Sequence, residues 1–119
     1  MKDLTIILGS AGFIGRSLSE HFKSKKSDVI GIDFLEGEDF QIDFITEFEK
    51  LKQIIEKFKP KTIVNLAALS NSNQCNKYKE KVYDLNVDFV KDLAIFCESK
   101  NVRNITSLLP RNNLAIQLT

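Results

Sequence analysis

The sequence is poor in the residues that build metal sites. It contains two cysteines, Cys75 and Cys97, and a single histidine among its 119 residues. The cysteines do not have the spacing of a metal motif, and one histidine cannot complete a zinc site with them at any recognisable interval. We therefore expect no bound metal, and we expect both thiols to stay reduced in a cytoplasmic protein.

Excess charge and long apolar runs are missing as well. The formal net charge of +1 gives no electrostatic reason to expect nucleic acid or an anionic membrane as a partner. No apolar run approaches the roughly 20 residues that a membrane span needs. The first strand-like run begins within three residues of Met1, so we expect no signal peptide. A single domain without membrane or nucleic-acid contacts is expected.

What the chain does contain is a regular alternation of two periodicities. Short apolar runs predict strands at Leu4–Leu8, Asp28–Ile32, 37–43, 61–68 and 102–106, and helical spacing predicts helices at 13–26, 46–60 and 80–100. Such alternation is typical of a parallel sheet covered by helices on both faces. The predicted fold class is therefore α/β, a Rossmann-like three-layer sandwich with five parallel strands in the order 3-2-1-4-5.

Three glycines stand where the first strand turns into the first helix. Gly9, Gly12 and Gly15 are spaced three residues apart. A helix that begins at the carboxyl end of a strand offers unpaired N–H groups and the positive end of its dipole, which suit a pyrophosphate. In this interpretation Gly9 makes the tight turn, Gly12 lets the phosphates approach, and Gly15 lets the helix pack on the sheet. The alternative is a glycine-rich turn that only packs tightly.

Asp33 favours the binding interpretation. It ends the second expected strand, 18 residues after Gly15, close to the acidic position expected in dinucleotide-binding folds. A carboxylate there accepts hydrogen bonds from the adenosine ribose and repels a 2′-phosphate, so it favours NAD over NADP. The alternative is a solvated aspartate in a turn.

The glycine spacing resembles a known family. Gly9-x-x-Gly12-Phe13-Ile14-Gly15 is similar to the motif of the extended short-chain dehydrogenases, the NAD-dependent epimerase/dehydratase family that acts on nucleotide sugars. The resemblance implies that Asp43 contacts the adenine amino group, with Phe44 beside it. It also implies that the segment after the fourth strand, Leu66 to Leu69, lines the nicotinamide side of the cleft.

Two asparagines match the family pattern and admit two roles. Asn65 and Asn86 either tie loops together or, for Asn86, contact the cofactor, and a buried amide needs partners in either role. The expected cofactor contacts are Gly9, Gly12, Phe13, Ile14, Gly15, Asp33, Phe34, Asp43, Phe44, Leu66, Ala67, Ala68, Leu69 and Asn86. Segment 64–87 resembles the dehydrorhamnose-reductase branch, which leaves the substrate open.

The resemblance ends near Ser107. Family members continue into a Tyr-x-x-x-Lys helix, a sixth strand and a substrate domain. Here the only tyrosines, Tyr78 and Tyr83, are followed four residues later by Val82 and Val87. We therefore expect an incomplete NAD-binding domain at residues 1–107, a tail of unassigned role at 108–119, and no catalytic residue in this chain.

Two functions follow from these observations. The first is the NAD(H)-binding part of a nucleotide-sugar epimerase, dehydratase or reductase, inactive alone and able to hold a nucleotide sugar only with a further segment. The second is a non-catalytic dinucleotide-binding module or sensor that works with a partner chain. Because the fifth strand is expected to be a bare sheet edge, we also expect a homodimer or aggregate to form through it.

Overall fold

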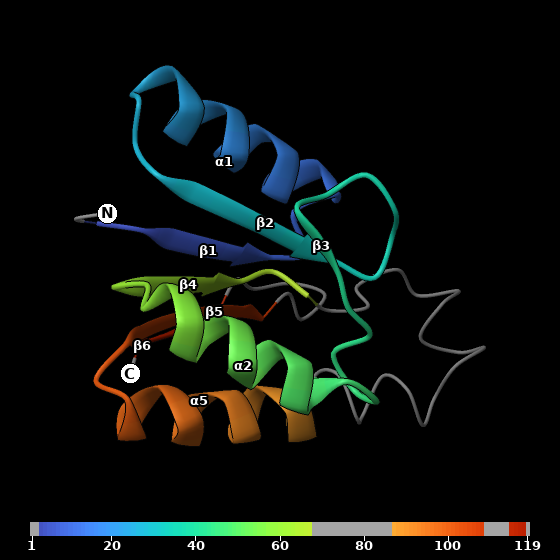
Figure 1. Cartoon of the computed structure of the whole chain (residues 1–119), viewed down its shortest axis with the longest axis vertical. Helices are drawn as coiled ribbons and strands as arrows, with labels where there is room; N and C mark the ends of the chain where they lie inside the picture. The colour runs from blue at the N-terminus through green and yellow to red at the C-terminus, as the bar shows by residue number, and fades with distance from the viewer. Residues whose placement is uncertain (1–2, 68–86, 109–114, 119) are drawn as a thin grey trace.

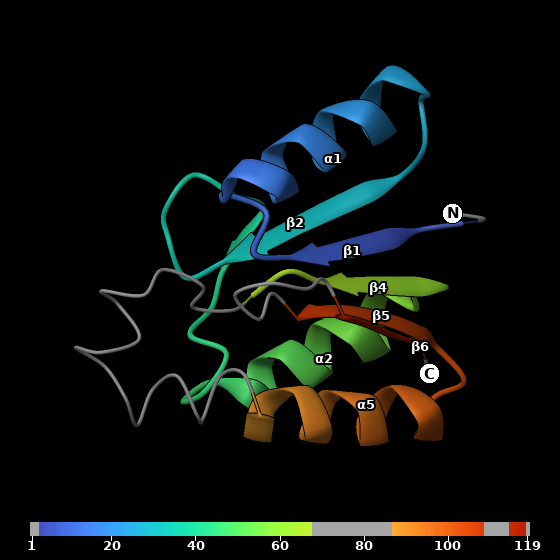
Figure 2. The ribbon, with the colours of Figure 1, turned by 180° about the vertical axis from the view of Figure 1, so that it is seen from behind.

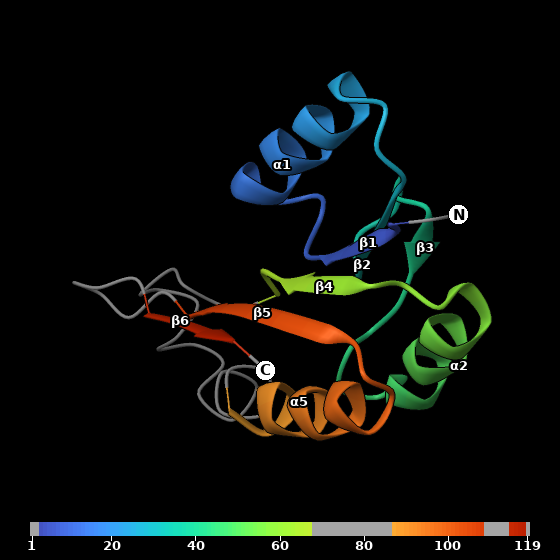
Figure 3. The ribbon, with the colours of Figure 1, turned by 90° about the vertical axis from the view of Figure 1, so that its left-hand side faces the viewer.

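The chain folds around one sheet with helices on both faces. The computed structural model describes residues 3–67, 87–108 and 115–118. Helix α1 (Phe13–Ser24) covers one face of the sheet, and helices α2 (Phe48–Phe58) and α5 (Phe89–Ser99) cover the other (Figures 1 and 3). The expected three layers are therefore confirmed.

The five expected parallel strands are present in the expected order. They are β1 (Thr5–Leu8), β2 (Val29–Asp33), β3 (Phe40–Gln41), β4 (Thr62–Asn65) and β5 (Arg103–Leu108). The sheet order is β3-β2-β1-β4-β5-β6, and neighbours from β3 to β5 pair in parallel. The predicted order 3-2-1-4-5 is thus confirmed, and β3 is the short strand that its weak apolar pattern indicated.

The expectation that the fifth strand forms an edge is wrong. A sixth strand, β6 (Ala115–Leu118), pairs antiparallel with β5 over four residue pairs. Its backbone groups therefore satisfy the side of β5 that was expected to be bare. Strand β6 is therefore the outer strand on this side of the sheet, and the homodimer stays a prediction.

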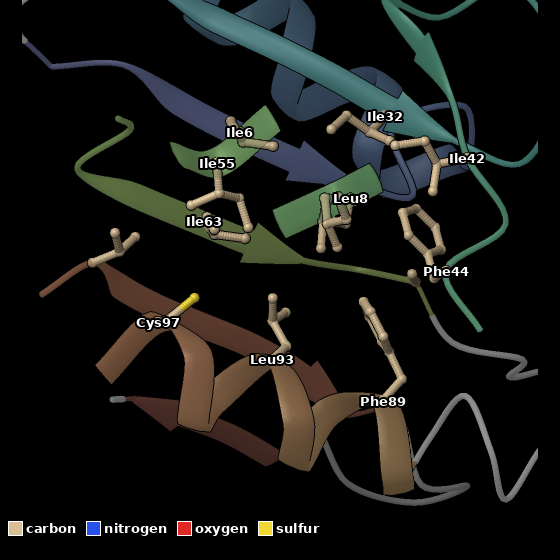
Figure 4. Packing of buried hydrophobic residues seen from close by; sticks show 13 residues of the cluster. Ile6, Leu8, Ile32, Ile42, Phe44, Ile55, Ile63, Phe89, Leu93 and Cys97 are labelled. Atoms are coloured by element: carbon tan, nitrogen blue, oxygen red, sulfur yellow. The ribbon is translucent and has the colours of Figure 1, made fainter. Parts of the chain in front are cut away.

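The main core lies between the sheet and the helices α2 and α5 (Figure 4). Ile6 and Leu8 of β1 point into it because alternate residues of a strand share a face. Phe89, Leu93 and Cys97 recur every four residues and line the buried side of α5. This packing fixes the sheet so that the ends of its strands are held at defined positions.

Candidate functional site

The carboxyl ends of three neighbouring strands meet at one edge of the sheet. The turn between β1 and α1 lies beside the end of β2 (Figure 2), and the Gly9 N–H donates to the Ile32 carbonyl at 2.8 Å. On the other side of β1, the Leu66 N–H donates to the Leu8 carbonyl at 2.8 Å. In open parallel sheets this edge is where ligands bind.

Gly9 and Gly15 are required by the fold itself. Gly9 has a φ of +84°, and a Cβ built there would lie 2.9 Å from the backbone carbon of Leu66. A Cβ on Gly15 would lie 2.8 Å from the Ser10 Cα. Both positions therefore exclude side chains because backbone comes too close, as the turn and packing roles of these two glycines require.

Gly12 differs from its two neighbours in the motif. A Cβ on Gly12 would meet only the Gly9 carbonyl oxygen, at an ordinary contact distance of 3.5 Å. Gly12 is exposed and has φ −73°, a conformation that any residue adopts. The fold has no need of glycine here, so the space above Gly12 is free for a ligand.

The first turn of α1 has no cap from a side chain. Gly12 is the N-cap residue and makes no side-chain hydrogen bond, and no acidic residue lies in the first turn. The N–H groups at a helix start have no partners within the helix and carry the positive end of its dipole. Phe13 and Ile14 are 82% and 52% exposed, so apolar side chains flank this start. Such a site suits an anion attached to an apolar group.

Asp33 lies beside this turn and is not a solvated residue. Its side chain is 4% exposed. Its Oδ2 accepts from the Ala11 N–H at 3.0 Å and its Oδ1 accepts from the Leu35 N–H at 3.2 Å. A carboxylate has about four acceptor positions, so each oxygen can still accept a hydroxyl donor. Asp33 therefore ties the glycine turn to the end of β2 and keeps acceptor capacity there.

The next residue, Phe34, is exposed at the end of β2. Its side chain is 57% exposed, and Leu35 is 49% exposed. The Phe34 carbonyl accepts from Gln41 Nε2 at 3.0 Å, so its backbone is held while its ring stays in solvent. The expected cofactor contact of Phe34 stays a prediction, and its exposure is compatible with it.

Asp43 follows β3 and caps a turn. Its Oδ1 accepts from the Ile45 and Thr46 N–H groups at 3.0 and 3.1 Å, and its own N–H donates to Glu47 Oε1 at 3.0 Å. The hydrogen bond from the Asp43 backbone, followed by that from Lys50, lowers the pKa of Glu47. Asp43 is exposed, so its predicted contact with adenine is sterically open and stays a prediction.

The structure places the Phe44 side chain in the core. Its side chain is 4% exposed and belongs to the core, where its ring packs on Phe89 with 5.4 Å between centroids. Ile42 is buried as well, whereas Asp43 between them is exposed. The chain alternates here, so Asp43 and Phe44 point to opposite sides. The Phe44 side chain is thus largely enclosed by the core, and the position beside the adenine that the resemblance implies for it stays a prediction.

The end of β4 supplies the other side of the site. Asn65 is 1% exposed, and its Oδ1 accepts from the Ala67 N–H at 3.0 Å, which is the loop-tying role that the sequence allowed. Leu66 is half-buried and Ala67 is buried. The predicted contacts Ala68, Leu69 and Asn86 lie outside the described residues, as do Tyr78, Tyr83 and Cys75.

Three residues near the site were not predicted. A Cβ on Gly31 would lie 2.7 Å from Ser10 Oγ, so Ser10 packs directly on the backbone of β2. Asp39 Oδ2 accepts from the Gly31 N–H at 2.8 Å. A glycine inside a strand often marks the close approach of another part of the chain, so Gly31 could have been predicted from the sequence. No sequence pattern indicated the roles of Ser10 and Asp39.

Other chemistry is sparse in the part of the chain that the structure describes. No group of three or more metal-ligating side chains occurs there. Cys97 is fully buried, and burial raises its pKa to about 11, so it is a poor nucleophile at neutral pH. No helix within residues 3–67 or 87–108 is long and apolar enough to cross a membrane.

Known proteins share this arrangement. Residues 5–109 match the NAD dependent epimerase/dehydratase family. The chain belongs to this family. The resemblance that rests on the glycine motif is therefore confirmed. A dTDP-4-dehydrorhamnose reductase from Aggregatibacter actinomycetemcomitans is 32% identical over 90 residues, which are 75% of this chain and 29% of that protein.

Solved structures agree on the fold. The UDP-glucose 4-epimerase from Brucella ovis in complex with NAD has a TM-score of 0.76 at 21% identity, over 87% of this chain and 35% of that one. The dTDP-4-dehydrorhamnose reductase from Bacillus anthracis str. Ames in complex with NADP has a TM-score of 0.70 at 23% identity, over 87% and 35%. The chain thus spans about a third of the length of these relatives.

Proposed function

We propose that this chain is the NAD(H)-binding part of a cytoplasmic nucleotide-sugar epimerase, dehydratase or reductase. The observation that carries the proposal is the pairing of an uncapped helix start at Gly12 with the Asp33 carboxylate, which the Ala11 N–H joins to the same turn. One part suits a pyrophosphate and the other suits ribose hydroxyls. Family membership supports the same class of cofactor.

Each residue has a separate task in this proposal. The N–H groups at the start of α1 bind the pyrophosphate, and the absence of a side chain at Gly12 leaves room for it. Asp33 accepts hydrogen bonds from the adenosine ribose. Leu66 and Ala67 place apolar surface at the end of β4, where the nicotinamide half lies in our proposal. When bound, the cofactor supplies the hydride acceptor or donor that the family's reactions need.

The structural relatives include complexes with NAD and with NADP, so the choice between them depends on this chain's own residues. The Asp33 carboxylate favours NAD because its charge repels a 2′-phosphate. Titrating the purified chain into NADH while following the nicotinamide fluorescence tests the proposal. Saturable binding that excess NAD reverses supports it, and an unchanged signal up to high protein concentration contradicts it.

The 119-residue chain alone is expected to show no turnover. Hydride transfer at a sugar carbon needs a proton moved on the attached oxygen, and a positioned acid/base group supplies that step. The sequence contains no Tyr-x-x-x-Lys segment, and orientation of a substrate against the nicotinamide contributes several further kcal/mol to such reactions. Incubation with NAD(H) and a panel of nucleotide-diphosphate sugars, followed by absorbance and chromatography, checks this expectation. Turnover above a control without protein would contradict it and would direct attention to Tyr78 and Tyr83.

A second candidate is a non-catalytic NAD(H)-binding module that works with another chain. A binding module has no need of a Tyr-x-x-x-Lys segment, and the 119 residues contain none. The DNA that follows the codon for Thr119 distinguishes the two candidates. A continuing frame that encodes Tyr-x-x-x-Lys supports the enzyme, and an isolated gene supports the module.

A further inference from the structure

Near the site, the Asp39 side chain takes the place of a strand residue as a hydrogen-bond acceptor for β2. Strand β3 has only two residues, and its ladder with β2 consists of the pairs Ile32–Phe40 and Asp33–Gln41. The Gly31 N–H lies just before this ladder and would need a third residue of β3 as its acceptor. Asp39 Oδ2 accepts from it instead, at 2.8 Å. A carboxylate that accepts from a backbone N–H forms one of the stronger types of hydrogen bond.

The same hydrogen bond fixes one end of the loop that follows Asp33. This loop, residues 34–39, joins β2 to β3, and two further hydrogen bonds hold its beginning. The Leu35 N–H donates to Asp33 Oδ1 at 3.2 Å, and Gln41 Nε2 donates to the Phe34 carbonyl at 3.0 Å. Between these anchors the loop turns at Gly37, whose φ is +101°. The loop is therefore held at both ends.

The loop also meets the glycine turn across Gly31. A Cβ on Gly31 would lie 2.7 Å from Ser10 Oγ and 3.2 Å from Glu38 Oε1. Ser10 and Glu38 therefore approach the same point above β2 from the two loops. Ser10 directly precedes Ala11, whose N–H donates to Asp33 Oδ2. The glycine turn and the 34–39 loop thus each donate one hydrogen bond to the Asp33 carboxylate, from the Ala11 and the Leu35 N–H.

We propose that Asp39 is a positioning residue for the cofactor site. By accepting from the Gly31 N–H it holds the 34–39 loop against the glycine turn, and so keeps the Asp33 carboxylate facing the ribose position. This inference rests on the proposed function, because its effect on affinity requires NAD(H) to bind at Asp33. Asp39 acts through Asp33 and the loop and needs no contact with the cofactor.

Asp39→Ala tests the proposal, with Asp39→Asn as the conservative variant. Loss of the acceptor should raise the hydrogen-exchange rates of the Ala11 and Leu35 amides and weaken NAD binding by roughly three- to tenfold, the effect of one hydrogen bond. The Asn side chain keeps an oxygen that can accept from Gly31, so it should restore both values to within about twofold of the parent. Asp28→Ala is the matched control, because it removes an exposed carboxylate just before β2, at the opposite end of that strand.

Amide exchange and NAD affinity report a positioning role of Asp39, whereas the melting temperature reports its effect on stability. A lowered melting temperature in Asp39→Ala, with Ala11 and Leu35 exchange and NAD affinity equal to those of Asp28→Ala, would overturn the proposal. If Asp39→Ala does not fold, Asp39→Glu displaces the carboxylate while keeping its charge and should give the same pattern of faster exchange. If the parent chain binds no NAD, the proposed function fails, and the exchange rates alone then support or overturn the positioning role of Asp39.

Discussion

Gly12→Val is expected to abolish measurable NAD binding while the chain remains folded. A side chain at this position would occupy the space that the pyrophosphate needs at the start of α1. We expect the fold to accept the substitution, because a new Cβ would meet only the Gly9 carbonyl oxygen at 3.5 Å and the φ of −73° suits any residue. Calorimetric titration with NAD and far-ultraviolet circular dichroism measure the two expectations together.

Two control variants test whether the effect of Gly12→Val is specific to its position. Ser24→Val adds a branched side chain at the far end of the same helix, where Ser24 is exposed, and it should bind NAD like the parent. Gly15→Ala should instead lose stability, by about 1–3 kcal/mol or more, because its Cβ meets the backbone of the β1–α1 turn. An unfolded Gly12→Val variant would mean that Gly12 is structural, and a folded variant with parental affinity would remove the pyrophosphate from this helix start.

Asp33 should determine the preference for NAD over NADP. Hydrogen bonds to a charged group contribute about 1.5–3 kcal/mol, so Asp33→Ala should weaken NAD binding roughly tenfold or more. It should weaken NADP binding much less, or improve it, because the charge that repels the 2′-phosphate is gone. The ratio of the two affinities is the quantity to measure, by calorimetry on the parent and on the variant.

The structure sharpens this test. Asp33 also accepts from Ala11 and Leu35, so the alanine variant loses two internal hydrogen bonds in addition to the ribose contact. Asp33→Asn keeps the shape of the side chain and one acceptor oxygen while removing the charge. It should therefore change the NADP affinity clearly and the free energy of unfolding only slightly. Asp28→Asn is a control for the loss of one negative charge. Equal affinity of the parent for NAD and NADP would contradict the role of Asp33.

Most of the fold could be predicted from the sequence because each element leaves a pattern within its own residues. Strands β1, β2 and β4 are short and mostly apolar, and helices α2 and α5 repeat buried side chains at helical spacing, as Phe89, Leu93 and Cys97 do in α5. The glycine turn could also be predicted, because three glycines and an aspartate stand at fixed intervals from the strand ends. Strand β6 escaped prediction because four residues after an unassigned segment give too short a pattern, and only its pairing with β5 defines it.

Details of the site depended on hydrogen bonds that sequence spacing does not encode. The contact between Asp39 and Gly31 spans eight residues and exists only because β3 is short and the 34–39 loop turns back. Phe44 was assigned to the cofactor through family resemblance, although the alternation of Ile42, Asp43 and Phe44 placed its side chain in the core.

The central claim is that NAD binds at the carboxyl edge of the sheet between the glycine turn and Asp33. The most direct measurement is a nitrogen–proton correlation spectrum of the labelled chain during titration with NAD. The account predicts that the amides of residues 9–15 and 33–35 shift together and saturate. It would be contradicted by shifts confined to the opposite edge, for example around the 370 Å³ hollow lined by Pro60, Lys100 and Val102, or by a spectrum that NAD leaves unchanged.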